Sequence, residues 1–344
     1  MSKSTIEIDG SQGEGGGQVL RTCLALSLIT GKAFHLRKIR AGRAKPGLQA
    51  QHLMSVQAAA RIGSAFVRGA SLQSVDLVFE PGPVYPGKYH FKIGTAGATS
   101  LVLHTVYLPL ALAGGESDVT IEGGTHVKAS PCFHFLERSW ARYLQTLGVS
   151  VELRLERVGF YPRGGGAIQA RIAAAPHVQP WRGATTLTTN KAVIVTLSAG
   201  LPPHVADRMS QLAAQRLRDW DFETETRHET WPGGPGCMIG IELSTVPAPT
   251  FLFALGERGK PAEAVAREAI DQVACYLKPD PLGIDEHSAD QLLLPLALAD
   301  GPSEFRVAAI SSHLLTNIEV IRHFLDRNIE CDGVEGKAGS VKVN

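Results

Sequence analysis

Apolar residues recur along this chain with two spacings, one typical of helices and one typical of strands. Residues 118–121 and 305–310 alternate between apolar and polar, which predicts strands with one buried face. Between them, Ser130 followed by Pro131 is typical of a helix N-cap and a first helical residue. The apolar stripe that follows at helical spacing consists of Leu136, Trp140, Tyr143, Leu144 and Leu147.

An internal repeat organises these elements. The segment LPLALA occurs at residues 108–113 and again at 294–299, 186 positions later. Each copy leads into a glycine turn, a short strand, a polar loop and a helix. An earlier copy is indicated by Phe34, which corresponds to Val119 at an offset of 85. The chain therefore reads as three copies of one α/β unit with layered helices and strands.

The two offsets differ, so the third copy must follow an insertion. We place the insertion at residues 185–280, because proline- and glycine-containing segments at 180–183 and 279–283 border it. The expected division is a discontinuous domain of residues 1–184 and 281–344, with an inserted α/β domain at 185–280. Inside the insertion, the pattern predicts strands at 192–198 and 240–246 and helices at 204–220 and 262–276.

The composition indicates a globular protein, with 44% hydrophobic and 19% charged residues. The apolar segment 101–113 is too short to span a bilayer, so no membrane partner is expected. The polar N-terminus followed by a strand-like alternation argues against a signal peptide. Five scattered cysteines without CxxC spacing fit reduced thiols better than disulfides or zinc ligands. These features together predict a cytoplasmic protein.

The net charge of +1 gives no indication of a basic surface over the whole protein, but one segment is strongly basic. Residues 37–45 carry Arg37, Lys38, Arg40, Arg43 and Lys45 without an acidic residue. This segment is either a phosphate-binding loop or a solvated loop at a strand edge, and its charge does not decide between them.

Two glycine-rich segments stand out. Residues 11–22, SQGEGGGQVLRT, form a turn between an expected strand and a helix that begins near Gln18. The segment matches neither a Walker loop nor GxGxxG, so it is a phosphate-binding turn or a tight structural one. Glu14 within it is a candidate ligand for magnesium or manganese. The second segment, residues 163–166, follows aromatic strand residues and reads as a strand turn.

Among the twelve histidines, His313 has the position best suited to chemistry. We place it after the strand 305–310 and just ahead of a helix that Thr316 and Glu319 would cap. A neutral imidazole there is a good nucleophile toward phosphorus. Its repeat counterpart His126 is the competing candidate. Surface or core roles are assigned to His52, His90, His177, His204 and His323.

Four motifs together resemble RNA 3′-terminal phosphate cyclases over essentially the whole chain. They are DGSQGEGGGQVLR (residues 9–21), IRAGRAKPGLQAQHL (39–53), GFYPRGGG (159–166) and SSHLLTNIEVI (311–321). The resemblance implies a threefold repeat of a βαβαββ unit, similar to enolpyruvyl transferases and to the C-terminal domain of initiation factor three.

The resemblance also implies an ATP-dependent reaction in three steps. The family histidine, here His313, would take AMP from ATP and release pyrophosphate. AMP would pass to the 3′-terminal phosphate of RNA, and the neighbouring 2′-hydroxyl would displace it to give a 2′,3′-cyclic phosphate. Mg²⁺ or Mn²⁺ and arginines would stabilise the phosphoryl charge. Monomer and homodimer both remain open.

Site roles carry over position by position. Arg40 and Arg43 match arginines that bind the substrate phosphate, and Glu14 matches a metal-binding residue. His104 stands where the family commonly has Gln. The positions matched to the nucleotide site are Glu14, Gln18, His104, Pro131, Phe135, His287, Ser288, Ala289, Asp290 and Gln291.

Two other functions compete with this interpretation. One is a non-catalytic cyclase-like protein that serves ribosome assembly, which would lack the nucleophile that His313 supplies. The other is an enolpyruvyl-type transferase, which would leave the HSADQ and HLLTN segments unexplained.

Overall fold

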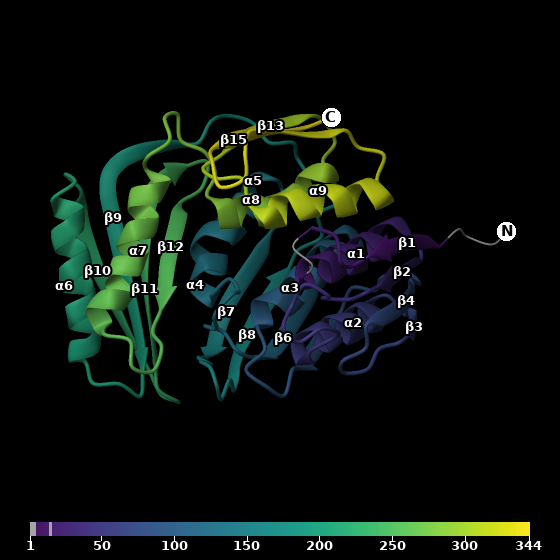
Figure 1. Ribbon diagram of the computed structural model, residues 1–344, viewed down its shortest axis with the longest axis horizontal. Coiled ribbons are helices and arrows are strands. Elements are labelled where there is room, and N and C mark those ends of the chain that lie inside the picture. Colours follow the sequence, from purple (N-terminus) through teal and green to yellow (C-terminus); the bar gives the residue numbers. More distant parts are fainter. Residues whose placement is uncertain (1–4, 14–15) are drawn as a thin grey trace.

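The computed structural model describes residues 5–13 and 16–344. These residues form a mixed α/β architecture with four separate sheets (Figure 1). In the first sheet the strand order is β1-β2-β4-β3, with β1 and β2 parallel and the other pairs antiparallel. Two helices join these strands. The elements are β1 (Ile6–Asp9), α1 (Gly17–Thr30), β2 (Phe34–Arg37), α2 (Ala50–Ile62), β3 (Phe66–Arg68) and β4 (Asp76–Glu80).

The second sheet repeats this arrangement. Its order is β5-β6-β8-β7, again with one parallel pair followed by two antiparallel pairs. The second crossover is helical but interrupted. The elements are β5 (Lys88–Lys92), α3 (Thr99–Leu112), β6 (Ser117–Gly123), α4 (Phe133–Phe135), the π-helix η1 (Leu136–Trp140), α5 (Ala141–Thr146), β7 (Val151–Arg157) and β8 (Gly166–Ile172).

A third sheet lies at the C-terminal end of the chain, with the order β13-β15-β14 and antiparallel pairs. Ile284 makes a parallel bridge to Val307, in the place that a full strand takes in the first two sheets. The elements are α8 (Glu286–Ala297), β13 (Ser303–Val307), α9 (Ser312–Phe324), β14 (Ile329–Asp332) and β15 (Gly339–Val343).

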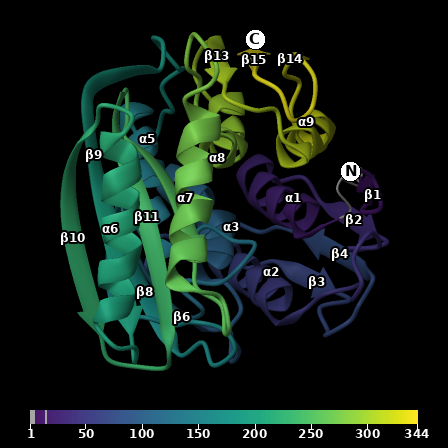
Figure 2. The ribbon, with the colours of Figure 1, turned by 60° about the vertical axis from the view of Figure 1, so that its left-hand side comes forward.

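The fourth sheet, β10-β9-β11-β12, contains only strands from residues 186–255. Helices α6 and α7 cover one face and share a separate hydrophobic cluster with it (Figure 2). Val195, Leu197 and Phe251 from this sheet belong instead to the main hydrophobic cluster. The elements are β9 (Thr186–Ala199), α6 (His204–Arg218), β10 (Glu223–Trp231), β11 (Gly236–Val246), β12 (Thr250–Leu255) and α7 (Ala262–Tyr276).

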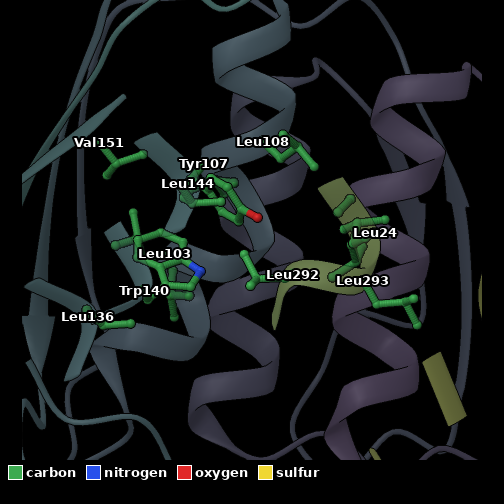
Figure 3. Packing of buried hydrophobic residues seen from close by; sticks show 14 of the residues in the cluster. Leu24, Leu103, Tyr107, Leu108, Leu136, Trp140, Leu144, Val151, Leu292 and Leu293 are labelled. Atoms are coloured by element: carbon green, nitrogen blue, oxygen red, sulfur yellow. The ribbon is translucent and has the colours of Figure 1, made fainter. Parts of the chain in front are cut away.

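The main core forms where helices from the three other units meet. Leu24 of α1, Tyr107 of α3 and Leu292 of α8 lie in one buried cluster (Figure 3). The predicted apolar stripe of residues 136–147 joins it, and all five of its side chains are buried. Burying such side chains stabilises the fold by roughly 1.5–3 kcal/mol each. The helices therefore hold the three units together from the inside.

The start of that stripe differs from the sequence prediction. The helix begins at Phe133 with Cys132 at its N-cap, so Ser130 and Pro131 lie in the preceding loop. The Ser130 hydroxyl donates to the Val127 carbonyl oxygen at 2.8 Å instead of capping the helix. The observed N-cap is therefore two residues later than the predicted one, and Ser130 stabilises the turn that precedes the helix.

No helix in the described part of the chain has both the length and the apolarity that crossing a bilayer requires. All five cysteines carry free thiols, and three of them are buried.

Candidate active site

His313 lies in the first turn of α9, whose first residue is Ser312. This corrects the sequence prediction, which placed His313 ahead of a helix capped by Thr316. The true N-cap is Ser311, whose hydroxyl oxygen accepts a hydrogen bond from the Leu314 N–H at 3.0 Å. Thr316 instead donates its hydroxyl to the Ser312 carbonyl oxygen at 2.7 Å. His313 is thus held directly at the positive end of a helix dipole.

Asp290 on α8 stands behind this helix start. Its carboxylate accepts a hydrogen bond from the Ser311 hydroxyl, the same group that caps α9. Burial raises the pKa of the Asp290 carboxyl to about 7, although the Ser311 hydrogen bond and the charge of His313 act in the opposite direction. Asp290 and His313 were separate candidates in the sequence, and the structure brings them into electrostatic contact.

The side chain of Asn317 connects α1, α8 and α9 and is almost fully buried. Its Nδ2 donates to the Asp290 carbonyl oxygen at 3.0 Å. Its Oδ1 accepts from Gln18 Nε2 at 3.1 Å and from the Thr22 hydroxyl at 2.7 Å. The Gln18 Oε1 in turn accepts from Arg21. The predicted site residues Gln18 and Asp290 are therefore joined through one amide.

The raised pKa of Asp290 predicts a pH-dependent stability. An unfolded aspartate has a pKa near 3.9, so the folded chain binds more protons than the unfolded chain between about pH 4 and 7. The protonated Asp290 therefore adds its full contribution to the free energy of unfolding below pH 4. This contribution is lost as the pH rises to about 7. Asp290→Asn keeps an acceptor for Ser311 but cannot ionise. Between pH 4 and 8, the wild type should lose roughly 2–4 kcal/mol relative to this variant in urea unfolding. A difference that stays constant with pH would contradict this account.

His104 lies on α3 against an aromatic cluster. Its ring centroid is 4.9 Å from that of Trp140 on the π-helix and 6.3 Å from that of Tyr107. Burial, with a smaller effect of the Arg21 charge, lowers the pKa of His104 to about 3, so the ring is neutral near pH 7. Both ring nitrogens and the Trp140 Nε1 are buried without hydrogen-bond partners among the described residues. Buried polar atoms of this kind usually have a partner.

The HSADQ segment forms the first turns of α8, and the helix points its members in different directions. Asp285, the N-cap, accepts from the Ser288 N–H at 2.9 Å. Ser288 is buried and lies 3.4 Å, oxygen to oxygen, from Ser139 on the π-helix. Ala289 is buried and Gln291 is half-buried.

His287 is exposed and lines a cavity of about 630 Å³ between α7 and the start of α8. The lining of this cavity includes Tyr276, Asp285 and Ala308 but not His313 or Asp290. The HSADQ segment therefore contributes to two places, the cavity and the His313 cluster.

The remaining nucleotide candidates have different surroundings. Pro131 is half-buried in the loop before α4. Phe135 is fully buried and packs against Phe253, with ring centroids 6.1 Å apart, so it has no surface for direct contact with a ligand. Glu14 lies outside the described residues.

The predicted phosphate-binding arginines differ in exposure. Arg40 is half-buried and adopts a positive φ of 55°. Its Nη1 donates to the carbonyl oxygens of Lys45 at 2.6 Å and Gly47 at 3.0 Å, so this guanidinium shapes the loop. Arg43 is exposed on the same loop. The two arginines thus combine a structural contact with a surface charge.

His126, the competing nucleophile candidate, is buried and only 1% exposed. The Thr125 hydroxyl oxygen lies 2.8 Å from His126 Nδ1, and His126 Nε2 lies 2.9 Å from His134 Nδ1, so hydrogen bonds join the three side chains. His134 Nε2 then donates to Glu229 on β10 at 3.2 Å. These four residues form a relay from the second unit to the fourth sheet. Its position inside the protein gives His126 no access to a substrate.

His52, assigned a surface or core role, lies beside the site. It is buried, and its Nδ1 accepts the Gln49 N–H at 3.2 Å at the start of α2. Its Nε2 faces Gly17, where an added Cβ would lie only 2.5 Å away. Burial, then the charges of Arg21 and Arg40, lower its pKa to about 3. Glycine at position 17 therefore lets α1 begin against this ring.

Comparison with known proteins identifies the family of this chain. The family model described as RNA 3′-terminal phosphate cyclase matches residues 12–331. A protein named RNA 3′-terminal phosphate cyclase from Methanopyrus kandleri is 40% identical over 99% of both chains. Proteins of the same name from Salmonella typhimurium and Koribacter versatilis are 42% and 43% identical, over 96% and 97% of this chain and 96% and 93% of theirs.

The chain belongs to the RNA 3′-terminal phosphate cyclase family. Within this cyclase family member, sequence reasoning did not single out Asn317 or Ser311 as parts of the site. Both stand in the SSHLLTN motif that carried the resemblance. Asn317 was the available signal, because a polar side chain beside apolar residues such as Ile318 needs a buried partner.

Proposed function

We propose that this protein converts an RNA 3′-terminal phosphate to a 2′,3′-cyclic phosphate at the expense of ATP. An imidazole nitrogen of His313 attacks the α-phosphorus, an N–P bond forms, and pyrophosphate leaves. A 3′-phosphate oxygen of RNA then attacks that phosphorus, breaking the N–P bond and carrying AMP onto the RNA end. Finally the 2′-hydroxyl attacks the 3′-phosphorus, loses its proton and expels AMP.

The observation that carries this proposal is the placement of His313. It stands in the first turn of α9, where the helix dipole favours an anionic phosphate, and it is backed by Asp290 and Asn317. Its nearest competitor, His126, is buried in a hydrogen-bonded relay. The last step gains from proximity, because the 2′-hydroxyl and the activated phosphate belong to one ribose.

We place the nucleotide between the HSADQ segment and His313. The two ring nitrogens of His104, which is 8% exposed and has no hydrogen-bond partner among the described residues, support a polar ligand beside α3. A side chain of Gln, common in the family at this position, and a neutral His can both exchange one hydrogen bond with such a ligand. Phe135, which lies fully in the core, would support this site from behind.

A divalent Mg²⁺ or Mn²⁺ is proposed from the resemblance, with Glu14 as its ligand. Among the described residues no group of three or more His, Cys, Asp or Glu side chains could hold a metal ion by itself. Phosphate oxygens would therefore supply much of the coordination, as is usual for magnesium at nucleotide sites. When bound, the ion would neutralise charge on the leaving phosphates.

The experiment is direct. An oligoribonucleotide with a 3′-terminal phosphate is incubated with the protein, ATP and Mg²⁺. The end should become resistant to phosphatase, with one AMP and one pyrophosphate formed per end. An RNA with a 2′-deoxy terminal nucleotide should accumulate the adenylated end without cyclising. Absence of cyclisation together with absence of pyrophosphate release would refute the proposal.

Replacing Arg43 should affect the use of 3′-phosphorylated RNA but not the formation of AMP–protein. Its exposed guanidinium can bond two phosphate oxygens at once, so Arg43→Ala should raise the KM for 3′-phosphorylated RNA by about tenfold or more. The rate of labelling by α-labelled ATP should stay within twofold of wild type. Arg37→Ala is the control, because it removes another exposed arginine of residues 37–45, whose guanidinium lies 3.4 Å from the Glu7 carboxylate. Equal loss of both half-reactions in Arg43→Ala would place this residue at the ATP or in the fold.

We also propose the architecture behind this site. The first two sheets and the C-terminal sheet, in which the bridge at Ile284 takes the place of a first strand, are taken as copies of one βαβαββ unit. This unit would be similar to that of enolpyruvyl transferases. Residues 185–280 are taken as an insertion between the second and third copies. The support is the matching strand order and the LPLALA segment, which spans the C-terminal end of α3 and again that of α8.

A further inference from the structure

The loop between β7 and β8 presents the most exposed large apolar side chain in the described part of the chain. Tyr161 is 77% exposed, whereas its neighbour Phe160 is buried. The Phe160 ring stacks on His126, with centroids 5.3 Å apart, and fills the space against Gly236. One aromatic residue therefore anchors the loop while the next one stands in solvent.

Glycines fix this arrangement through close backbone contacts. Gly164 has a φ of 65°, and a Cβ there would lie 2.7 Å from the Cα of Ala96. The Gly159 N–H donates to the Thr125 hydroxyl at 2.9 Å. The loop therefore packs against the loops that follow β5 and β6. These contacts fix the backbone on both sides of Tyr161.

These loops also connect to the loop that carries Arg43. The Ala98 N–H donates to Gln51 at the start of α2 at 2.9 Å, and α2 follows the loop that carries Arg43. Ala98 immediately precedes α3, which carries His104 in its second turn. The path therefore runs from Arg43 by way of Gln51 and Ala98 to the Tyr161 loop. It follows the carboxyl ends of parallel strands, where ligands of α/β sheets usually bind.

The charges along the Tyr161 loop suit a phosphate backbone. Arg163 is exposed and pairs with no carboxylate among residues 5–13 and 16–344. Arg157 is more than half exposed and contacts Glu122 only at 3.5 Å, while its Nε donates to the Gly165 carbonyl oxygen at 3.3 Å. Lys128 is exposed but tied to Glu257 at 3.0 Å. Arg163, two residues after Tyr161, is thus the exposed cation of this loop that has no carboxylate partner among the described residues.

We propose that the loop of residues 158–165 binds the single-stranded part of the RNA upstream of its 3′ end. Tyr161 stacks on a base, and Arg163 binds a backbone phosphate. An exposed aromatic ring with adjacent arginine is the combination that holds single strands without sequence preference. This inference rests on the proposed function, since it assumes that the 3′ end lies at His313 and Arg43.

The test measures binding of fluorescent oligoribonucleotides with a 3′-phosphate, without ATP, by anisotropy. Tyr161→Ala should weaken binding of a decamer about tenfold, and Tyr161→Phe should stay within twofold of wild type. Arg163→Ala should weaken it several-fold and lower the salt dependence by about one phosphate contact. A dinucleotide should bind all variants alike, because it does not reach the loop. Tyr85→Ala is the control, since Tyr85 is 54% exposed but precedes β5 at its opposite end.

Decamer binding by Tyr161→Ala within twofold of wild type would overturn the inference, and so would an equal loss for the dinucleotide. Thermal melting of each variant shows that it is folded. The two proposals fail separately. If the wild type does not form AMP–protein or cyclic ends but Tyr161→Ala still loses the decamer, the binding surface stands and the proposed function falls. If the wild type cyclises RNA and Tyr161→Ala binds normally, only the binding surface falls.

Discussion

His313→Ala should abolish both the formation of AMP–protein and the cyclisation of RNA, by at least about a thousandfold in rate. The reason is that the N–P bond of the proposed intermediate cannot form without the imidazole. His313→Asn should be equally inactive, since an amide can hydrogen bond but is no nucleophile. His313 is half-buried in the first turn of α9, so the free energy of unfolding should change little. The measurement is labelling with α-labelled ATP, followed by peptide mass spectrometry at mildly alkaline pH.

A matched control lies on the same helix. His323 is exposed in the last turn of α9, and His323→Ala should take up label at the wild-type rate. His126→Ala loses a buried hydrogen-bonded ring and should be less stable, but the folded fraction should still form AMP–protein. AMP on His126 or on a lysine, or label on a folded His313→Ala protein, would refute the role given to His313.

Asn317→Leu should lower the free energy of unfolding by about 3–5 kcal/mol. Leucine has a similar volume but leaves the Thr22 hydroxyl, the Gln18 amide and the Asp290 carbonyl oxygen without their partner. Each such buried polar group costs roughly 1–3 kcal/mol when its hydrogen bond is removed. Urea unfolding at pH 7 measures the effect.

The double variant Thr22→Val with Asn317→Leu checks the cause. If the cost of Asn317→Leu comes from orphaned partners, removing the Thr22 hydroxyl as well should recover about 1 kcal/mol or more. Thr22→Val alone should destabilise, because it leaves Asn317 with one donor fewer. A loss of less than about 1 kcal/mol in Asn317→Leu, or strict additivity of the two substitutions, would contradict the network as described.

Much of the fold follows from patterns that local physics makes visible. The stripe of residues 136–147 is buried as predicted, and β9, β11, α6 and α7 occur close to their expected places. The strand β10 was missed because its sequence, ETETRHETW, is polar on both faces and mostly exposed at a sheet edge. The strand β12 was missed because TFLFAL is a short continuous apolar run, which does not alternate.

The sequence offered candidate residues for the site but not their arrangement. A capping serine at position 311 and a capping-box pattern at Thr316 are both plausible helix starts, and only tertiary contacts decide between them. Ser311 is the N-cap because its hydroxyl accepts from the Leu314 N–H and at the same time donates to the Asp290 carboxylate. Likewise, the buried position of Phe135 depends on packing against Phe253, 118 positions away, which no local pattern indicates.

The relay from Thr125 to Glu229 limits how this protein can be trimmed. Deleting residues 185–280 would remove the acceptor for His134 Nε2 and strand a buried imidazole. The same deletion would uncover the side of the main core now covered by Val195, Leu197 and Phe251. A minimal version of the chain would therefore need a redesigned patch at both places, a nonpolar replacement for the two histidines and a polar surface over the opened core. The fourth sheet is therefore an integral part of the packing of the main core.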